Sequence, residues 1–194
     1  MNLNLTMSAG KRADGRHRQE NDYYATEPNA VRIFLNKLKQ DGVILNKNIW
    51  ECACGEGHMA EVFKEYNYNV YATDLIDRSY GTPNVDFLTT CDFPRDCDIF
   101  TNPPFKLAKE FAYRGNEILD KDHKFGLFVK IQFLESKSRK ILFELYPPKY
   151  IYVYSERQQC SMNGDFDNLK AKTQAYIWVI WEKDYKGETI IRWI

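Results

Sequence analysis

The stretch Asn102-Pro103-Pro104-Phe105 constrains the fold of this chain more than any other segment. Residues 98–101 before it have the pattern of a short buried strand. The two prolines stop that strand, because they lack backbone donors and fix an extended, rigid turn. The turn leaves the Asn102 side-chain oxygen and backbone carbonyls facing outward, beside the Phe105 ring. Such a group suits an exocyclic amine, since the oxygens accept its two N–H bonds and the ring stacks on the base.

Strand and helix patterns alternate along the rest of the chain. The predicted strands cover residues 49–53, 69–73, 85–87, 98–101, 125–129, 150–154 and 175–181, and 190–193 is expected to pair with the last of these. The predicted helices cover residues 29–40, 57–65, 107–119 and 133–145. This alternation predicts a single α/β domain over residues 21–194, with a Rossmann-like, doubly wound, mostly parallel sheet of seven strands. Ligands of such sheets bind at the carboxyl ends of the strands.

Length and composition exclude several classes of protein. A chain of 194 residues is one domain of ordinary size, and it has no apolar run near the ~20 residues that span a bilayer. Its five cysteines are scattered without a disulfide framework, which favours a reducing cytoplasm. The net charge is zero, so contact with nucleic acid depends on how the charge is distributed. Residues 1–20 are polar and basic and are predicted to form a flexible arm.

Two glycines mark a ligand-binding turn. Gly55 and Gly57 follow a predicted strand and open a helix, a context that lets the backbone approach a ligand closely. The third glycine of the dinucleotide fingerprint is missing, because Ala60 stands at its position, and there is no P-loop sequence. Asp74 follows about 20 residues later at the next strand end, where a carboxylate can take both ribose hydroxyls.

Asp86 and Phe87 stand at the end of the third predicted strand. Asp86 can accept a hydrogen bond from an adenine amino group, and the Phe87 ring can cover the face of the base. Together with Asp74, these residues describe a site for a nucleoside without a phosphate cradle. That combination points away from NAD and ATP and toward S-adenosylmethionine.

These segments resemble those of S-adenosylmethionine-dependent amino-methyltransferases of nucleic acids, and most of all the small adenine-N6 DNA methyltransferases encoded by phages and prophages. The similarity lies in residues 51–57, 74, 86–87 and 102–105 and extends to 22–28, to 133–135 with Arg139, and to 175–181. It implies a class I methyltransferase fold and methyl transfer to the N6 amine of a flipped-out adenine in DNA, without a metal. The motif begins with Asn rather than Asp, which the family permits. It ends in Phe rather than Tyr, and Phe is also frequent in adenine-N6 methyltransferases that act on RNA.

The resemblance also implies which residues form the site. The catalytic residues would be Asn102, Pro103, Pro104 and Phe105. The residues that would bind the cofactor are Tyr24, Thr26, Glu51, Cys52, Ala53, Gly55, Gly57, His58, Asp74, Asp86, Phe87 and Asn102. The basic side chains expected to contact nucleic acid are Lys11, Arg12, Arg16, Arg18, Lys130, Arg139, Arg157, Lys170 and Lys172.

Some of these residues have structural alternatives. Cys52 and Cys54 are expected to be structural rather than metal ligands, because a strand alternates their side chains and no second pair lies at ligand spacing. His58 contacts the methionine end of the cofactor or packs at the start of a helix, and both options stay open. The segment 157–172 is either a solvated loop or a nucleic-acid contact, and its place after the sixth predicted strand favours the second.

Several functions share these motifs. The main alternative is an adenine-N6 methyltransferase of RNA, followed by a cytosine-N4 or protein-glutamine methyltransferase. A binding module that has lost turnover is a different class, and the complete set of motifs argues against it. No separate target-recognition domain is visible. The sequence therefore leaves open which target is recognised and whether the chain forms a homodimer or needs a separate specificity partner. It also leaves open whether the chain belongs to a restriction-modification system.

Overall fold

The computed structural model describes residues 24–158, 160–161 and 174–194. Seven strands form one mixed sheet with the order β3-β2-β4-β5-β8-β6-β9. They are β2 (Asn48–Glu51), β3 (Asn69–Ala72), β4 (Asp98–Thr101), β5 (Lys124–Lys130), β6 (Tyr150–Val153), β8 (Tyr176–Glu182) and β9 (Ile190–Trp193). β8 runs antiparallel to β5 and β6, and the other neighbouring pairs are parallel. The expectation of a single α/β domain with a mostly parallel, seven-stranded sheet is confirmed.

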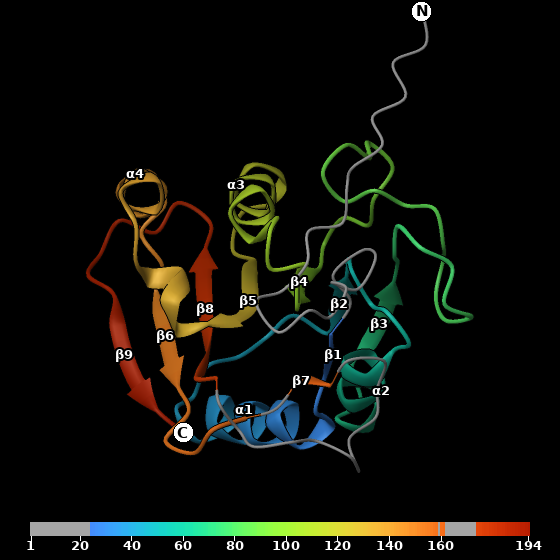
Figure 1. Ribbon diagram of the computed structural model, residues 1–194, viewed down its shortest axis with the longest axis horizontal. Coiled ribbons are helices and arrows are strands. Elements are labelled where there is room, and N and C mark those ends of the chain that lie inside the picture. Colours follow the sequence, from blue (N-terminus) through green and yellow to red (C-terminus); the bar gives the residue numbers. More distant parts are fainter. Residues whose placement is uncertain (1–23, 159, 162–173) are drawn as a thin grey trace, which may run out of the picture.

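Helices cover both faces of this sheet (Figure 1). α1 and α2 lie on one face, and α3 and α4 lie on the other. Their bounds are α1 (Pro28–Gln40), α2 (His58–Glu65), α3 (Ala108–Ile118) and α4 (Lys137–Leu145), and the short 3-10 helix η2 (Ile131–Leu134) precedes α4. β5 and β8 are buried along almost their whole length, as is typical of central strands with helices on both sides.

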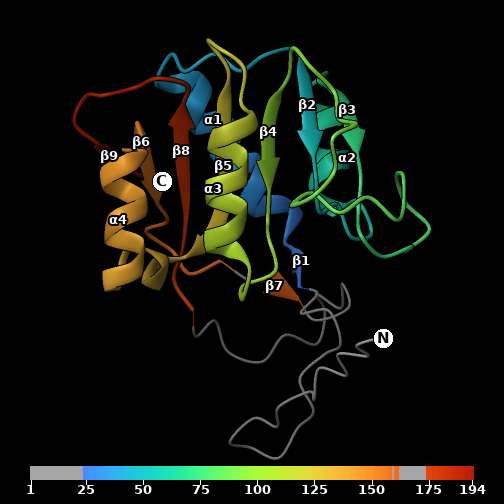
Figure 2. The same cartoon turned by 90° about the horizontal axis from the view of Figure 1, so that it is seen from above.

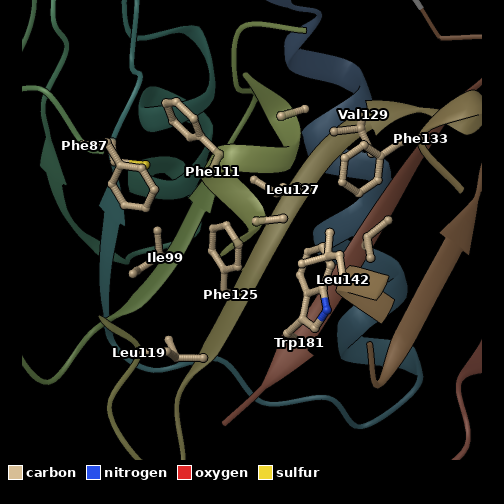
Figure 3. Close-up of a cluster of buried hydrophobic side chains, with 14 of the residues drawn as sticks. Phe87, Ile99, Phe111, Leu119, Phe125, Leu127, Val129, Phe133, Leu142 and Trp181 are labelled. Carbon is tan, nitrogen blue, oxygen red and sulfur yellow. The ribbon is translucent and has the colours of Figure 1, made fainter. Parts of the chain in front are cut away.

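The two helical layers bury separate apolar clusters. On the α3 side, Phe125 stacks on Trp181 at a centroid distance of 5.4 Å, and Leu142 of α4 joins the same cluster (Figure 3). On the α1 side, Phe34 stacks on Trp178 at 4.3 Å. Both tryptophans are fully buried and belong to the core. Full burial of a large apolar side chain contributes about 1.5–3 kcal/mol.

Two predicted elements differ from the structure at the sheet edges. Residues 85–87 do not form a strand, and the described chain contributes only an isolated bridge between Thr73 and Thr82 there. The cause is local: Asp86 Oδ1 accepts a hydrogen bond from the backbone N–H of Leu88, which favours a turn over an extended strand. The seventh strand is instead residues 190–193. They pair with β6 and not with β8, because β5 and β6 already occupy both sides of β8.

The predicted helix over residues 133–145 is also divided. Its first part is η2, and α4 begins only at Lys137. Ser136 interrupts the helix with a φ of 112° and caps α4, because its side chain accepts a hydrogen bond from the Arg139 N–H.

A second, two-stranded sheet lies beside the main one. β1 (Ala25–Thr26) pairs antiparallel with β7 (Cys160–Ser161). Figure 2 shows this pair at the edge toward which the arrows of β2, β3 and β4 point. The carboxyl ends of the parallel strands and the β1–β7 pair therefore share one edge of the molecule, where ligands of such sheets bind. Within the residues described, no helix is long and apolar enough to cross a membrane.

Candidate active site

A cleft opens at the carboxyl ends of β2, β3 and β4. Its volume is about 860 Å³, including the part open to solvent. The predicted site residues that line it are Tyr24, Thr26, Glu51, Cys52, Ala53, His58, Asp74, Asp86, Phe87, Asn102, Pro103, Pro104 and Phe105. Gly55 and Gly57 do not line it directly, and they form the turn between the lining residues Cys54 and His58. The structure thus brings the predicted cofactor-binding residues and the predicted catalytic residues into one cavity.

The glycine turn depends on its two glycines. Gly55 has a φ of 55° and Gly57, the N-cap of α2, has a φ of 83°, values that residues with a Cβ rarely adopt. At Gly57 there is also no space, because a Cβ would overlap the Tyr80 ring. Gly57 N–H donates to the Cys54 carbonyl at 2.8 Å, which closes the turn. The turn therefore holds the chain after β2 tightly against the start of α2.

Asp74 connects this turn to β3. Its Oδ2 accepts from the Gly55 N–H at 2.8 Å, and its Oδ1 accepts from the Ile76 N–H at 2.9 Å. A carboxylate oxygen can accept more than one hydrogen bond, so both oxygens keep capacity for further donors at the cleft.

Glu51, at the end of β2, is a buried carboxyl group. The residue is 2% exposed, and its Oε2 has no hydrogen-bond partner among the described residues. Burial raises the pKa of Glu51 well above its usual range and Asp74 raises it further, whereas a hydrogen bond from the Ala60 N–H opposes the shift. A buried acceptor without a donor is uncommon and suits a ligand that carries a proton donor or a positive charge.

Asp86 and Phe87 reach the cleft from a turn rather than from a strand end. Asp86 accepts from the Leu88 N–H at 2.9 Å and from the Thr89 hydroxyl at 3.1 Å. Phe87 is anchored in the core, where its ring contacts Trp50 edge-on at 5.3 Å. The residue that sequence analysis places over a base is therefore held rigidly at the side of the cleft that faces the core.

The Asn102 amide has one engaged end and one unpaired end. Its Nδ2 donates to the Tyr24 carbonyl at 2.9 Å and to Thr26 Oγ1 at 3.0 Å, and Cys160 Sγ lies 3.8 Å away. A carbonyl oxygen can only accept, so the contact with Tyr24 determines which end of the amide is nitrogen. The oxygen, Oδ1, is buried and has no partner in the part of the chain that the structure describes.

Phe105 completes the predicted catalytic loop, residues 102–105. Its ring stacks on Tyr24 at a centroid distance of 5.1 Å and lies 6.3 Å from the Tyr176 ring. Lys130 Nζ lies 4.2 Å from the Phe105 ring centroid, a distance typical of a cation–π contact. Lys130, expected to contact nucleic acid, is thus next to the predicted catalytic aromatic residue.

Other predicted nucleic-acid contacts lie elsewhere. Arg139 donates to the Gln132 carbonyl at 2.9 Å and lies over the Phe133 ring, so its guanidinium is bound to η2. Arg157 is an exposed residue just before β7. The remaining basic residues, Lys11, Arg12, Arg16, Arg18, Lys170 and Lys172, lie outside the described residues, as does the predicted arm 1–20.

The cysteines are all unpaired. Cys52 packs in the cluster under α3, and Cys54 packs against Ala60 and Ala72. No group of three or more His, Cys, Asp or Glu side chains in the described chain is arranged to hold a metal ion. The two cysteines of the glycine segment are therefore buried packing residues.

Sequence analysis missed several residues of the site, among them Arg78, which lines the cleft. Cys160 and Tyr176 lie against the catalytic loop, and Tyr80 covers the glycine turn. Cys160 comes from a strand of two residues, which is too short for a periodic pattern. Burial raises the pKa of its thiol to about 12 and raises that of the Tyr176 hydroxyl as well. Both side chains therefore stay neutral beside Asn102 at neutral pH.

The fold has many counterparts among solved structures. One is a provisional class I S-adenosylmethionine-dependent methyltransferase from Listeria monocytogenes, with a TM-score of 0.64 and 13% identity, covering 91% of this chain and 67% of the other. Another is a provisional RNA methyltransferase from Pyrococcus horikoshii, with a TM-score of 0.61 and 13% identity, covering 84% and 87% of the two chains. At such identities the similarity shows the fold alone.

A third counterpart is the methyltransferase subunit of a type I restriction-modification system from Streptococcus thermophilus. Its TM-score is 0.62 at 13% identity, and the match covers 89% of this chain. The match covers only 48% of the Streptococcus subunit. No protein-family model matches the sequence. No curated protein matches it either. The structural comparisons show that the chain has the class I methyltransferase fold.

Proposed function

We propose that this protein transfers a methyl group from S-adenosylmethionine to the N6 amino group of adenine in DNA. The observation that carries the proposal is the Asn102 amide, whose oxygen is buried without a partner among the described residues while its nitrogen is engaged. A buried polar atom without a partner costs about 1–3 kcal/mol. The amino group of a substrate supplies the donor that this oxygen lacks.

The cleft suits S-adenosylmethionine. Asp74 keeps acceptor capacity for two ribose hydroxyls, and the turn of positive-φ glycines holds the adjacent backbone close to the cleft. The buried Glu51 Oε2, which has no partner among the described residues, can accept a hydrogen bond from the amino group of such a molecule. When bound, the cofactor supplies an electrophilic methyl group on a sulfonium.

The catalytic loop holds and orients the amine. Asn102 Oδ1 and the Pro103 carbonyl accept its two N–H bonds and draw the nitrogen toward tetrahedral geometry, so that its lone pair is less delocalised into the ring. Phe105 stacks on the base. As the new N–C bond forms and the S–C bond breaks, the nitrogen loses one proton to water, because an amide is not a base. Positioning of this kind supplies most of the rate.

The adenine must leave the duplex to reach this loop, which costs a few kcal/mol of pairing and stacking. Lys130 next to Phe105 supports this step, because a cation at the mouth of the site can contact a phosphate of the displaced nucleotide. The Streptococcus counterpart supports a nucleic-acid substrate and a modification role. RNA is the second candidate, favoured by Phe at position 105 and by the Pyrococcus counterpart.

The proposal is tested with the full chain and a cofactor that carries a labelled methyl group. Equal amounts of duplex DNA, single-stranded DNA and RNA are offered, and the methylated nucleosides are identified by mass spectrometry. We expect N6-methyladenine in DNA, lost in Asn102→Ala and retained in Asn36→Ala, an exposed asparagine of α1 that contacts Tyr66. Labelled methyl groups found only in RNA would support the second candidate, a methyltransferase that acts on RNA. Cofactor binding without methylation of any nucleic acid would refute the proposal.

A further inference from the structure

The two-stranded sheet β1–β7 crosses the catalytic loop at Asn102. Thr26 lies opposite Cys160 in the β1–β7 register, and both residues contact the Asn102 amide nitrogen, as does the Tyr24 carbonyl just before β1. Thr26 is 4% exposed and Ser161, in the neighbouring pair, is 1% exposed. The pairing thus holds Thr26 rigidly at one end of the amide.

We propose that Thr26 and the Tyr24 carbonyl are positioning groups that orient the Asn102 amide and make this site specific for asparagine over aspartate. The inference rests on the proposed function, because it concerns the oxygen that receives the target amine. Thr26 was expected to bind the cofactor, and its hydroxyl oxygen accepts a hydrogen bond from Asn102. Its effect on the reaction passes through Asn102.

The argument depends on the two ends of an amide being different. Rotated by half a turn, Asn102 would direct its oxygen at the Tyr24 carbonyl and present N–H donors to the substrate amine, which cannot accept them. The Tyr24 carbonyl, 2.9 Å from Nδ2, can only accept and therefore excludes that state, and the Thr26 hydroxyl at 3.0 Å adds a second acceptor for the observed one. A carboxylate at the same position would place a charged oxygen against the Tyr24 carbonyl. The Thr26 hydroxyl can rotate and donate a hydrogen bond to this charged oxygen, but the Tyr24 carbonyl has no proton to donate.

A protonated carboxyl group would reproduce the asparagine pattern. Its O–H donates to the Tyr24 carbonyl, and its C=O stays available to the substrate. The variant Asn102→Asp is therefore expected to be active only in its protonated form. Its activity should fall about tenfold for each pH unit above the pKa of the introduced carboxyl, as for a group required in its acid form.

Other titratable groups surround this position. Cys160 lies next to the amide, and Tyr176 and Lys130 lie against the Phe105 ring. The titratable or charged residues that line the same cleft are Tyr24, Glu51, Cys52, Cys54, His58, Asp74, Arg78 and Asp86. The negative charge of Glu27 also raises the pKa of the Cys160 thiol. All of these groups are common to wild type and variant, so the comparison uses the ratio of the two rates at each pH.

The first experiment measures methyl transfer by wild type and Asn102→Asp between about pH 5 and pH 9 under single-turnover conditions. The ratio of variant to wild-type rate is expected to rise as the pH falls. A ratio that does not change with pH, or a variant as active as wild type at high pH, would overturn the proposal. Carbon-13 NMR of the introduced carboxyl gives a readout that needs no substrate. A carboxyl titration near or below the normal value of about 3.9 would overturn the proposal even if the proposed reaction failed.

The second experiment compares Thr26→Val with Thr26→Ser. Valine keeps the shape and removes the acceptor, so turnover should fall about tenfold or more while calorimetry shows an unchanged affinity for S-adenosylmethionine. Serine restores the hydroxyl and is expected to restore turnover. If Thr26→Val weakens cofactor binding and leaves turnover at saturating cofactor intact, Thr26 is a cofactor residue and the positioning role is wrong. Thermal unfolding of both variants shows whether they are folded.

Discussion

The backbone N–H of Gly55 donates a hydrogen bond of 2.8 Å to Asp74 Oδ2, so the turn after β2 is joined directly to the loop after β3. The other carboxylate oxygen accepts from Ile76, which fixes the loop that follows. Asp74 thus holds two loops of the cleft in place before any ligand arrives. Such pre-organisation reduces the entropy cost of binding.

Asp74→Ala is accordingly expected to weaken binding of S-adenosylmethionine or its demethylated product by about 1–3 kcal/mol, the usual cost of losing hydrogen bonds to a charged group. Calorimetry without metal or ATP measures the affinity. Asp77→Ala is the matched control, because Asp77 also accepts a backbone N–H in the same loop but does not line the cleft. Equal affinities in wild type and Asp74→Ala would refute the role of Asp74.

Gly57→Ala is expected to destabilise the protein by more than the cost of a positive φ alone, which is about 1–3 kcal/mol. The extra cost comes from overlap of the new Cβ with the Tyr80 ring. Gly42→Ala is the control, since Gly42 has a similar φ of 70° and no atom within 4 Å of an added Cβ. Urea unfolding gives both free energies. A Gly57→Ala variant no less stable than Gly42→Ala would show that Tyr80 moves aside freely.

Glu51→Gln is expected to change the pH dependence of stability. In the folded wild type, burial raises the Glu51 pKa above its unfolded value of about 4.3. The folded state therefore binds the proton more tightly, and wild-type stability falls as the pH rises from the unfolded toward the folded pKa. Glutamine carries no such proton, so the variant should gain stability relative to wild type between acidic and neutral pH. Urea unfolding across this range measures the difference, with exposed Glu117→Gln as the control for loss of charge.

Phe105→Ala is expected to reduce turnover strongly while leaving cofactor affinity near wild type. Loss of one stacking contact with a base costs about 1–3 kcal/mol. The variant also removes the ring that Tyr24 and Lys130 contact. Lys130→Ala therefore serves as a comparison: it should weaken binding of nucleic acid and reduce its salt dependence, with turnover of bound substrate retained. Full activity of Phe105→Ala at saturating DNA would remove the ring from the mechanism.

Deletion of residues 1–20 is expected to lower the affinity for DNA and to flatten its dependence on salt, because Lys11, Arg12, Arg16 and Arg18 would no longer contact phosphates. Phosphate contacts carry little sequence information, so the target site should be short or relaxed. Binding and methylation assays at several salt concentrations compare the two forms. Unchanged behaviour of the truncated chain would mean that the basic arm does not contact the substrate.

Much of the fold is predictable from local pattern. The glycine turn, Asp74 and Asn102 each stand where an apolar strand ends, and parallel strands bring their carboxyl ends together. The predicted strand at 85–87 is wrong because the Asp86 side chain competes with strand pairing for a nearby N–H. The predicted helix over 133–145 is divided because Ser136 takes a φ that no periodicity reveals.

What sequence could not supply is the contact between distant segments. The partner of β9 depends on which strand sides remain open after β5, β8 and β6 have assembled. The orientation of the Asn102 amide depends on Tyr24 and Thr26, more than 70 residues away in the chain. Such contacts follow from the folded geometry and leave no periodic signal in the sequence.

The antiparallel pairing of β1 with β7 also determines where the chain leaves the site. Ala25 lies opposite Ser161, so the connection toward residue 1 and the connection that follows Ser161 depart from the same end of this pair. The pairing of β1 with β7 therefore fixes both connections at one point, next to the residues that hold the Asn102 amide.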